Sequence, residues 1–164
     1  MKPKQNKALE FALRLITKTD KTEAEILNRL YKKGFSEEEI KETIEYLKNK
    51  GFINDLKFIQ KAEKIAEDRF LGMIGLKSYF IRRGIDRDLI QNIPEIDELS
   101  IAMRLIQRKS HFFKDISPDK KKAKITGFLL RRGFSWDTIN ECLKMSEKIF
   151  EDKESLQNKH LKEV

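Results

Sequence analysis

One pattern of eleven residues occurs three times in the chain and constrains the fold more than any other feature. The copies are LYKKGFSEEEI at Leu30 to Ile40, FIRRGIDRDLI at Phe80 to Ile90 and LLRRGFSWDTI at Leu129 to Ile139. Each copy has two apolar or aromatic residues, two cations, a glycine, an apolar residue, a Ser or Asp, and a final isoleucine. The glycines stand 50 and then 49 residues apart. A constant spacing of this size is typical of a repeat protein.

Each copy is expected to form a corner at which one helix ends and another begins. In the first copy, Lys32 and Lys33 fall where cations favour the negative end of a helix dipole. Gly34 can then take the left-handed conformation that ends many helices. Ser36 and Glu39 have the spacing of a capping box for the next helix. The pattern therefore predicts helix, glycine, short turn, cap and helix in every copy.

The other copies and their flanks follow the same plan. Asp86 and Ser135 occupy the cap position in the second and third copies, and Phe35 is expected to fold back on the helix it follows. A further helix is predicted before each pair of helices that meet at a corner, at Ala8 to Thr17, Asp55 to Phe70 and Asp97 to Lys109. Thr22 with Glu25 predicts one more capping box, and Ser117-Pro118 predicts a cap with proline at the first helical position. In the last helix, Trp136, Ile139 and Leu143 form the predicted apolar stripe.

The predicted fold class is therefore all-α, with three tandem three-helix repeats that form an elongated, curved array. The expected boundaries are residues 1–52, 53–95 and 96–150, followed by a frayed tail at 151–164. The letters GMIG at Gly72 to Gly75 match the clamp loop of a KH domain. A KH domain needs a sheet, and because no segment alternates like a strand, we favour a flexible helix–helix turn.

The charge of the chain indicates an acidic partner, although solvated helix faces would explain it too. The 35 Lys and Arg exceed the 27 Asp and Glu, which gives a net charge of +8. Between Ile96 and Gly133 there are ten cations and four anions, whereas the first repeat is rich in glutamate. Phe112 and Phe113 adjoin this basic stretch and could stack on bases, but we expect both in the core.

The residues that usually carry catalysis or bind metals are scarce. Cys142 is the single cysteine and is expected in the core, and the two histidines have no partner at metal-ligand spacing. Phosphate-binding loops and nucleophile motifs are absent from the sequence. We therefore expect no enzyme, no metal and no cofactor. Neither a cleavable signal peptide nor a membrane-length apolar run is visible, so a cytoplasmic protein without membrane contact is expected.

At this point the residues resemble the RecX family of regulators of the RecA recombinase. The first repeat, from Thr22 to Ala62, is similar to the family's signature, including the GFIND connector at Gly51 to Asp55. The stretches RFLGMIGLKSYFIRRGI at Arg69 to Ile85 and ITGFLLRRGFSWDTI at Ile125 to Ile139 are similar to its middle and closing repeats. The chain departs from the family where Tyr79-Phe80 replaces a frequent Glu-Leu, and where Pro94 shortens the helix after the second corner.

The resemblance implies a small monomeric modulator, in most members an inhibitor, that lies in the groove of the RecA–single-stranded DNA filament. It would hinder ATP hydrolysis, strand exchange and coprotease activity. The candidate contacts with RecA or DNA are basic residues, carried over from the corners and the basic stretch: Lys32, Lys33, Arg82, Arg83, Arg104, Arg108, Lys109, Arg131 and Arg132. Helix capping alone would also explain the pairs.

Two other interpretations of the sequence remain open. Each corner resembles a helix-turn-helix, which suggests a DNA-binding protein that acts without RecA. Against this, the helix after Ser36 offers Glu37, Glu38 and Glu42, which would repel a phosphate backbone. A helical scaffold for another partner is the third interpretation, if neither DNA nor RecA binds.

Overall fold

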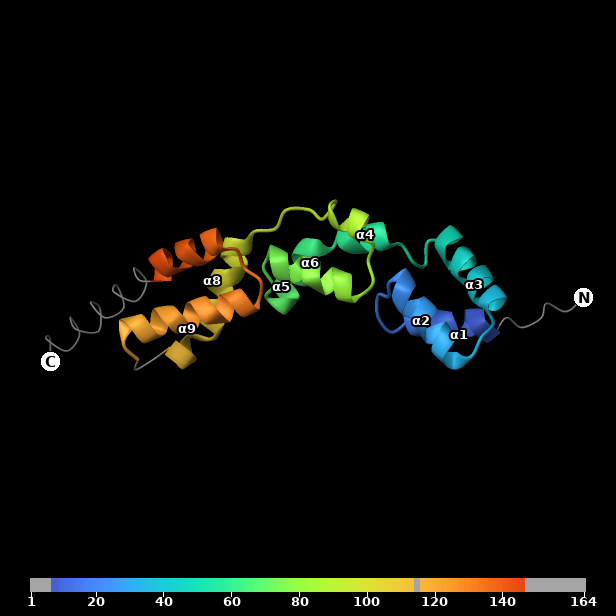
Figure 1. Ribbon diagram of the computed structural model, residues 1–164, viewed down its shortest axis with the longest axis horizontal. Helices are drawn as coiled ribbons and strands as arrows, with labels where there is room; N and C mark the ends of the chain where they lie inside the picture. Colours follow the sequence, from blue (N-terminus) through green and yellow to red (C-terminus); the bar gives the residue numbers. More distant parts are fainter. Residues whose placement is uncertain (1–6, 114–115, 147–164) are drawn as a thin grey trace, which may run out of the picture. The chain divides into compact units, whose positions relative to one another are not determined.

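The computed structural model describes residues 7–113 and 116–146, and every regular element in these ranges is a helix (Figure 1). The elements are α1 (Lys7–Ile16), α2 (Glu23–Lys33), α3 (Glu37–Asn49), α4 (Asp55–Ile59), α5 (Ala62–Arg69), α6 (Met73–Arg82), α7 (Arg87–Ile90), α8 (Glu98–Arg108), the 3-10 helix η1 (Ser110–Phe113), α9 (Pro118–Arg131) and a last helix over residues 136–146. The predicted all-α class is confirmed.

The chain divides into two compact units. Unit 1 comprises Met1–Ala62 and Lys77–Pro94, and unit 2 comprises Glu63–Leu76 and Glu95–Val164. The repeat boundaries expected from the sequence stay a prediction, and the tail at 151–164 lies outside the described residues. Within the described ranges, no helix combines the length and the apolar character that crossing a bilayer requires.

The first three helices pack around a small apolar core in unit 1 (Figure 1). Each helix contributes residues from one face, as the spacing of apolar residues predicts. The fully or nearly fully buried side chains are Ala8, Ala12, Ile26, Leu30, Ile40, Ile44, Leu47 and Ile53. Phe35 folds back onto this core as expected, with its ring centroid 6.0 Å from that of Phe11.

The predicted helix ends are confirmed at all three corners. Gly34, Gly84 and Gly133 have φ angles of +86°, +78° and +72°, in the left-handed region that L-residues with a Cβ avoid. The next helix is capped each time by the expected side chain: Ser36 accepts from the backbone N–H of Glu39, Asp86 from that of Asp88, and Ser135 from that of Thr138.

The second corner is joined to the start of α2 within unit 1. The Thr22 hydroxyl donates to the carbonyl oxygen of Arg83 over 2.7 Å. A Cβ atom built on Gly84 would lie 2.4 Å from the Cβ of Ala24. The two segments are therefore so close that only a glycine fits at the corner.

The third corner is joined in the same way to the start of α6 within unit 2. The N–H of Gly72 donates to the carbonyl of Arg132, and that of Ile74 to the carbonyl of Gly133, both over 3.1 Å. A Cβ on Gly133 would lie 2.1 Å from the nitrogen of Gly75. The GMIG stretch lies where a turn joins α5 to α6, as expected, although Met73 to Gly75 already belong to α6. Its small residues let two backbones touch, so the stretch forms a tightly packed joint.

Each joint also has one carboxylate that accepts the first N–H of the docked helix. Asp55, at the first position of α4, accepts from the N–H of Glu23 over 3.1 Å. Glu98, at the first position of α8, accepts from the N–H of Met73 and also from the hydroxyls of Ser135 and Thr138. These unpaired N–H groups at helix starts need such an acceptor.

Three sequence expectations need correction. The single helix expected from Asp55 to Phe70 is two helices, because the N–H of Lys61 turns back to the carbonyl of Phe58 and ends α4. Trp136 is 60% exposed and not part of the buried stripe, since Phe134 fills the core at this corner instead. Pro118 begins α9 as expected, but the Ser117 side chain makes no capping hydrogen bond within the described residues.

The joints predict unequal costs for the same substitution at two corners. Gly133→Ala should lower the free energy of unfolding by about 2–5 kcal/mol, because left-handed strain adds to a backbone clash. Gly34→Ala should cost only about 1–2 kcal/mol, since no described atom lies within 4 Å of the added Cβ. Urea unfolding followed by circular dichroism, with Trp136 fluorescence for unit 2, measures both, and equal losses would contradict the joint.

Candidate functional site

The basic pair of the first corner is exposed. Lys32 and Lys33 lie in the last turn of α2, where their charges face the end of the helix dipole. The helix that follows presents exposed glutamates to solvent. The first pair is therefore placed as a helix cap would be, on a surface of mixed charge.

The basic pair of the second corner is divided between solvent and the interior of unit 1. Arg82 is exposed, whereas the side chain of Arg83 is only 16% exposed. The guanidinium of Arg83 donates to both carboxylate oxygens of Glu25, over 2.8 and 2.5 Å. It also donates to the carbonyl of Asp20 and to the hydroxyl of Tyr79. Tyr79 thus supplies a further oxygen acceptor to the same arginine.

The pKa values of the pair follow from these contacts. Burial opposes ionisation of Glu25 most strongly, yet the hydrogen bonds from Arg83 and from the Thr22 backbone lower the pKa of Glu25 overall. The hydrogen bond to Glu25 raises the pKa of Arg83. The guanidinium carbon also lies 4.6 Å from the centroid of the Phe58 ring. Arg83 is therefore an internal anchor of the second corner.

Arg132 has the corresponding position at the third corner. Its guanidinium donates to the carbonyl of Arg69 over 2.7 Å and lies 5.9 Å from the ring centroid of Phe128. Its neighbour Arg131 is exposed. In both arginine pairs the first member thus faces solvent and the second reaches back to a carbonyl that precedes the docked helix.

Of the predicted cations, Arg108, Lys109 and Arg132 line a hollow of about 410 Å³ in unit 2, and Arg104 does not. Arg104 pairs with Glu67 over 2.7 Å, and the guanidinium of Arg108 lies 5.5 Å from the ring centroid of Phe70. The lining residues of this first hollow are Asp68, Arg69, Phe70, Leu105, Arg108, Lys109 and Arg132. Four cations and one carboxylate line it, so its potential is positive.

A second hollow of about 650 Å³, here called the aromatic groove, shares Lys109 with the first. The described residues that line it are Lys109, Phe112, Phe113, Ala123, Lys124, Gly127, Phe128 and Arg131, none of which is a carboxylate. The expectation that both phenylalanines of η1 are core was wrong for one: Phe113 is 5% exposed and Phe112 57%. Consecutive side chains of a 3-10 helix point about 120° apart, so only one of them can face the core.

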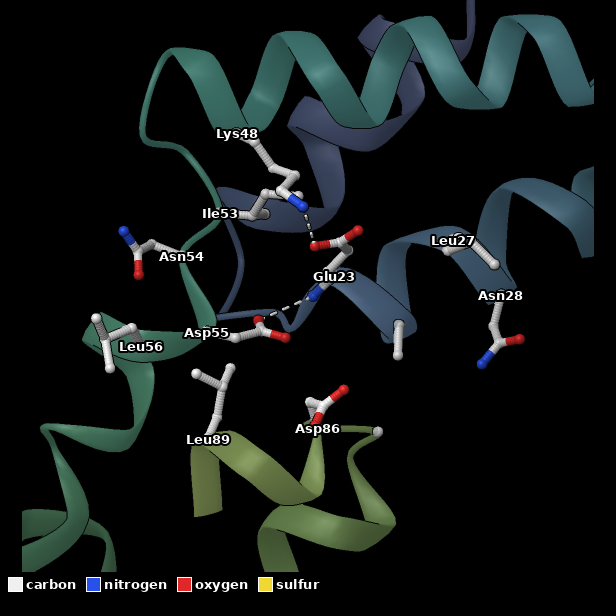
Figure 2. Close-up of a pocket in the computed structure, with 12 residues that line it drawn as sticks. Glu23, Leu27, Asn28, Lys48, Ile53, Asn54, Asp55, Leu56, Asp86 and Leu89 are labelled. Atoms are coloured by element: carbon white, nitrogen blue, oxygen red, sulfur yellow. Dashed lines mark hydrogen bonds and ion pairs between the residues drawn. The ribbon is translucent and has the colours of Figure 1, made fainter. Parts of the chain in front are cut away.

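Unit 1 carries a pocket of about 660 Å³ in which acidic side chains outnumber basic ones (Figure 2). Glu23, Asp55 and Asp86 line it, together with Lys48, whose ammonium pairs with Glu23 over 2.8 Å. Burial raises the pKa of Asp55 above its ordinary value. Because Asp55 holds the first N–H of α2, the pocket lies against the joint of unit 1.

The structure thus brings together Arg108, Lys109, Arg131 and Arg132 around two adjoining hollows in unit 2. The pairs 32–33 and 82–83 belong to unit 1. Sequence reasoning missed Arg69, Phe70, Lys124 and Phe128 as lining residues, because each looks like an ordinary helix residue in the sequence and the hollows form only on folding. Among the residues the structure describes, no cluster of metal-ligating side chains is found. Cys142 is buried as expected, and burial raises the pKa of its thiol to about 11.

Comparisons with known proteins find one family. A model of the RecX first three-helix domain matches residues 8–47, and one of the RecX third three-helix domain matches residues 95–143. Regulatory protein RecX from Clostridium perfringens strain SM101 is 36% identical over 141 residues, which cover 81% of this chain and 65% of that protein. Regulatory protein RecX from Chlorobaculum tepidum is 29% identical, over 87% of this chain and 89% of that protein. The chain thus spans just under two thirds of the length of the Clostridium perfringens relative.

Solved structures share the fold. The crystal structure of RecX from Lactobacillus salivarius has a TM-score of 0.69 and 21% identity, and covers 85% of this chain and 94% of that one. A second crystal structure, of a regulatory protein RecX, has a TM-score of 0.70 and 16% identity, over 83% of this chain and 71% of that one.

The Arg83 network predicts that two neighbouring arginines differ in their effect on stability. Arg83→Lys should lower the free energy of unfolding by about 1–3 kcal/mol, because an ammonium cannot replace the forked bonds to Glu25. The matched change Arg82→Lys should alter the free energy of unfolding by no more than about 0.5 kcal/mol, since Arg82 is exposed. Urea unfolding with hydrogen exchange of α2 measures both. Equal effects would show that Arg83 is no anchor.

The same network predicts an acid-dependent loss of stability. A carboxylate with a lowered pKa stabilises the folded state above its ordinary value, 4.5 for Glu25, and this contribution is lost as pH falls through the lower folded pKa. Glu25→Gln should therefore be less stable at pH 7, and its stability should decline less steeply below pH 4.5 than that of the wild type. Parallel pH profiles of the unfolding midpoint for the two proteins would contradict this.

Proposed function

The chain belongs to the RecX family, and we propose that it regulates the RecA recombinase by binding the filament that RecA forms on single-stranded DNA. Inhibition is the proposed direction. By occupying the filament groove as a cytoplasmic monomer, the protein would hinder ATP hydrolysis, strand exchange and coprotease activity.

The observation that carries the proposal, beside the family, is the pair of adjoining basic hollows in unit 2. Among the described residues that line them are Arg69, Arg108, Lys109, Lys124, Arg131 and Arg132, against one described carboxylate, Asp68. A surface of one sign attracts a polyanion and raises its rate of association. A nucleoprotein filament presents such a polyanion in the form of DNA phosphates.

A DNA-binding protein of the helix-turn-helix kind, acting without RecA, is less well supported by the corners. After the first corner, α3 begins with three exposed glutamates, Glu37 to Glu39. After the second, α7 has only four residues, too few for a helix that reads a major groove. After the third, the exposed residues at the start of the last helix are Trp136 and Asp137, and Asp137 would repel a phosphate.

The test is to add the protein to preformed RecA filaments on single-stranded DNA and to follow ATP hydrolysis. A decline at substoichiometric protein supports a filament regulator, provided that a control protein sequestering the same amount of DNA has little effect. Unchanged hydrolysis, by a protein that still binds bare DNA, would instead favour action on DNA alone.

Charge reversal at two exposed corner cations locates the contact. Arg131→Glu should weaken the effect on hydrolysis by about tenfold or more, because it replaces a cation of the basic surface by an anion and so removes a contact with a DNA phosphate. Lys32→Glu should change the effect on hydrolysis less than twofold. Arg131 is chosen over Arg132 because Arg132 holds the third corner. Equal, negligible effects would leave these residues as helix caps.

A further inference from the structure

We propose that the aromatic groove holds single-stranded DNA directly, with a base stacked on Phe112 and phosphates on Lys109, Lys124 and Arg131. The inference rests on the proposed function for the source of the strand, which is the DNA of the RecA filament. It adds which face of the chain meets the DNA and by what chemistry.

The groove is open because of a glycine that the helix itself does not need. Gly127 lies inside α9, and a Cβ built on it would meet only the guanidinium of Arg131, at 3.4 Å. Within a helix, glycine is less favourable than alanine. Unlike the corner glycines, Gly127 is compatible with a side chain, so what its bare backbone provides here is the hollow between α9 and η1.

Phe112 is held in place and left exposed at the rim of this hollow. Its neighbour Phe113 is buried and fixes η1 to the core of unit 2. The ring centroid of His111 lies 4.1 Å from that of Phe112, and the ammonium of Lys109 lies 5.3 Å from it. An aromatic ring that packs against a neighbouring ring and remains 57% exposed is the kind of platform on which a nucleobase stacks.

The charges around the platform favour a phosphodiester strand. Lys109, Lys124 and Arg131 line the groove, and none of the described residues that line it is acidic. The first hollow, which shares Lys109, continues the positive surface with Arg69 and Arg108. A strand that crosses the groove would therefore find cations before and after the base that stacks on Phe112.

A single strand fits this arrangement better than a duplex or an acidic peptide. In a duplex the faces of the bases are covered by their neighbours, so an exposed ring has nothing to stack on. An acidic peptide would use the cations alone and would leave the Phe112 ring exposed. Only an unpaired strand uses both the aromatic face and the positive rim.

The experiment measures binding of the full chain to a fluorescent oligothymidylate of about 20 nucleotides, chosen to exceed a typical site of about 4–16. A second oligonucleotide keeps every phosphate but has abasic sites in place of most bases. The variants are Phe112→Ala and Phe112→Tyr, and the matched control is Tyr46→Ala. Tyr46 is also an exposed aromatic with a lysine over its ring, Lys50 at 5.9 Å, but it lies on the glutamate-rich α3.

If the inference holds, Phe112→Ala weakens binding of the thymidylate at least fivefold and leaves binding of the abasic strand unchanged. The Phe112→Tyr and Tyr46→Ala variants bind the thymidylate with an affinity within twofold of that of the wild type. Gly127→Leu, which fills the groove, should weaken thymidylate binding without lowering the melting temperature. This second variant keeps the test decisive if Phe112→Ala proves unstable.

Three results would overturn the inference. The abasic strand could bind as tightly as the thymidylate, Phe112→Ala could bind like Tyr46→Ala, or polyglutamate could bind with the same dependence on Phe112. Because the assay contains no RecA, it separates the two proposals. Loss of the Phe112 effect alongside intact inhibition of RecA refutes the groove only, whereas a Phe112 effect without inhibition refutes the proposed function only.

Discussion

The fold depends on backbone contacts at the glycine corners. At the third corner the carbonyl of Gly133 accepts the N–H groups of Ile74 and Gly75, and no Cβ could stand between them. The corner residue must also have a positive φ to turn the chain out of the preceding helix. Glycine alone meets both demands. The second corner is also joined to a helix start in unit 1, there through the Thr22 hydroxyl, whereas a Cβ on Gly34 would have no described atom within 4 Å. The recurring sequence therefore marks a helix end in every copy and a close contact in the second and third copies.

The joints explain why adjacent cations have different roles. Arg83 and Arg132 each reach a backbone carbonyl beyond the corner, and a planar guanidinium can do so while also contacting an aromatic ring. Their neighbours Arg82 and Arg131 remain exposed to solvent. A count of positive charges in the sequence therefore overstates the positive surface, because part of that charge is compensated within the fold.

The acidic residues of the unit 1 pocket and the basic residues of the unit 2 hollows have different roles. In unit 1 the carboxylate of Asp55 holds the start of α2, and its pocket is closed on another side by the Lys48–Glu23 ion pair. In unit 2 the described residues that line the hollows are mainly cations and phenylalanines, with Asp68 as the one carboxylate among them. The same corner design thus supports an acidic pocket in one unit and a basic, aromatic surface in the other, because the helix surfaces are free to vary once the joints are made.

The sequence by itself determined the helical class, the three corners, their caps and the family, because these depend on local chemistry: glycine for a positive φ, Ser or Asp for unpaired N–H groups, and apolar spacing for a buried face. It also pointed to a basic third repeat. Only the tertiary structure decided that Arg83 is internal, that Phe112 is exposed while Phe113 is buried, and that Gly72 and Gly75 form a joint. The first and third of these outcomes depend on which segments meet across fifty or more residues, and local spacing carries no information on such contacts. Which of the two phenylalanines faces the core depends on how η1 packs in unit 2.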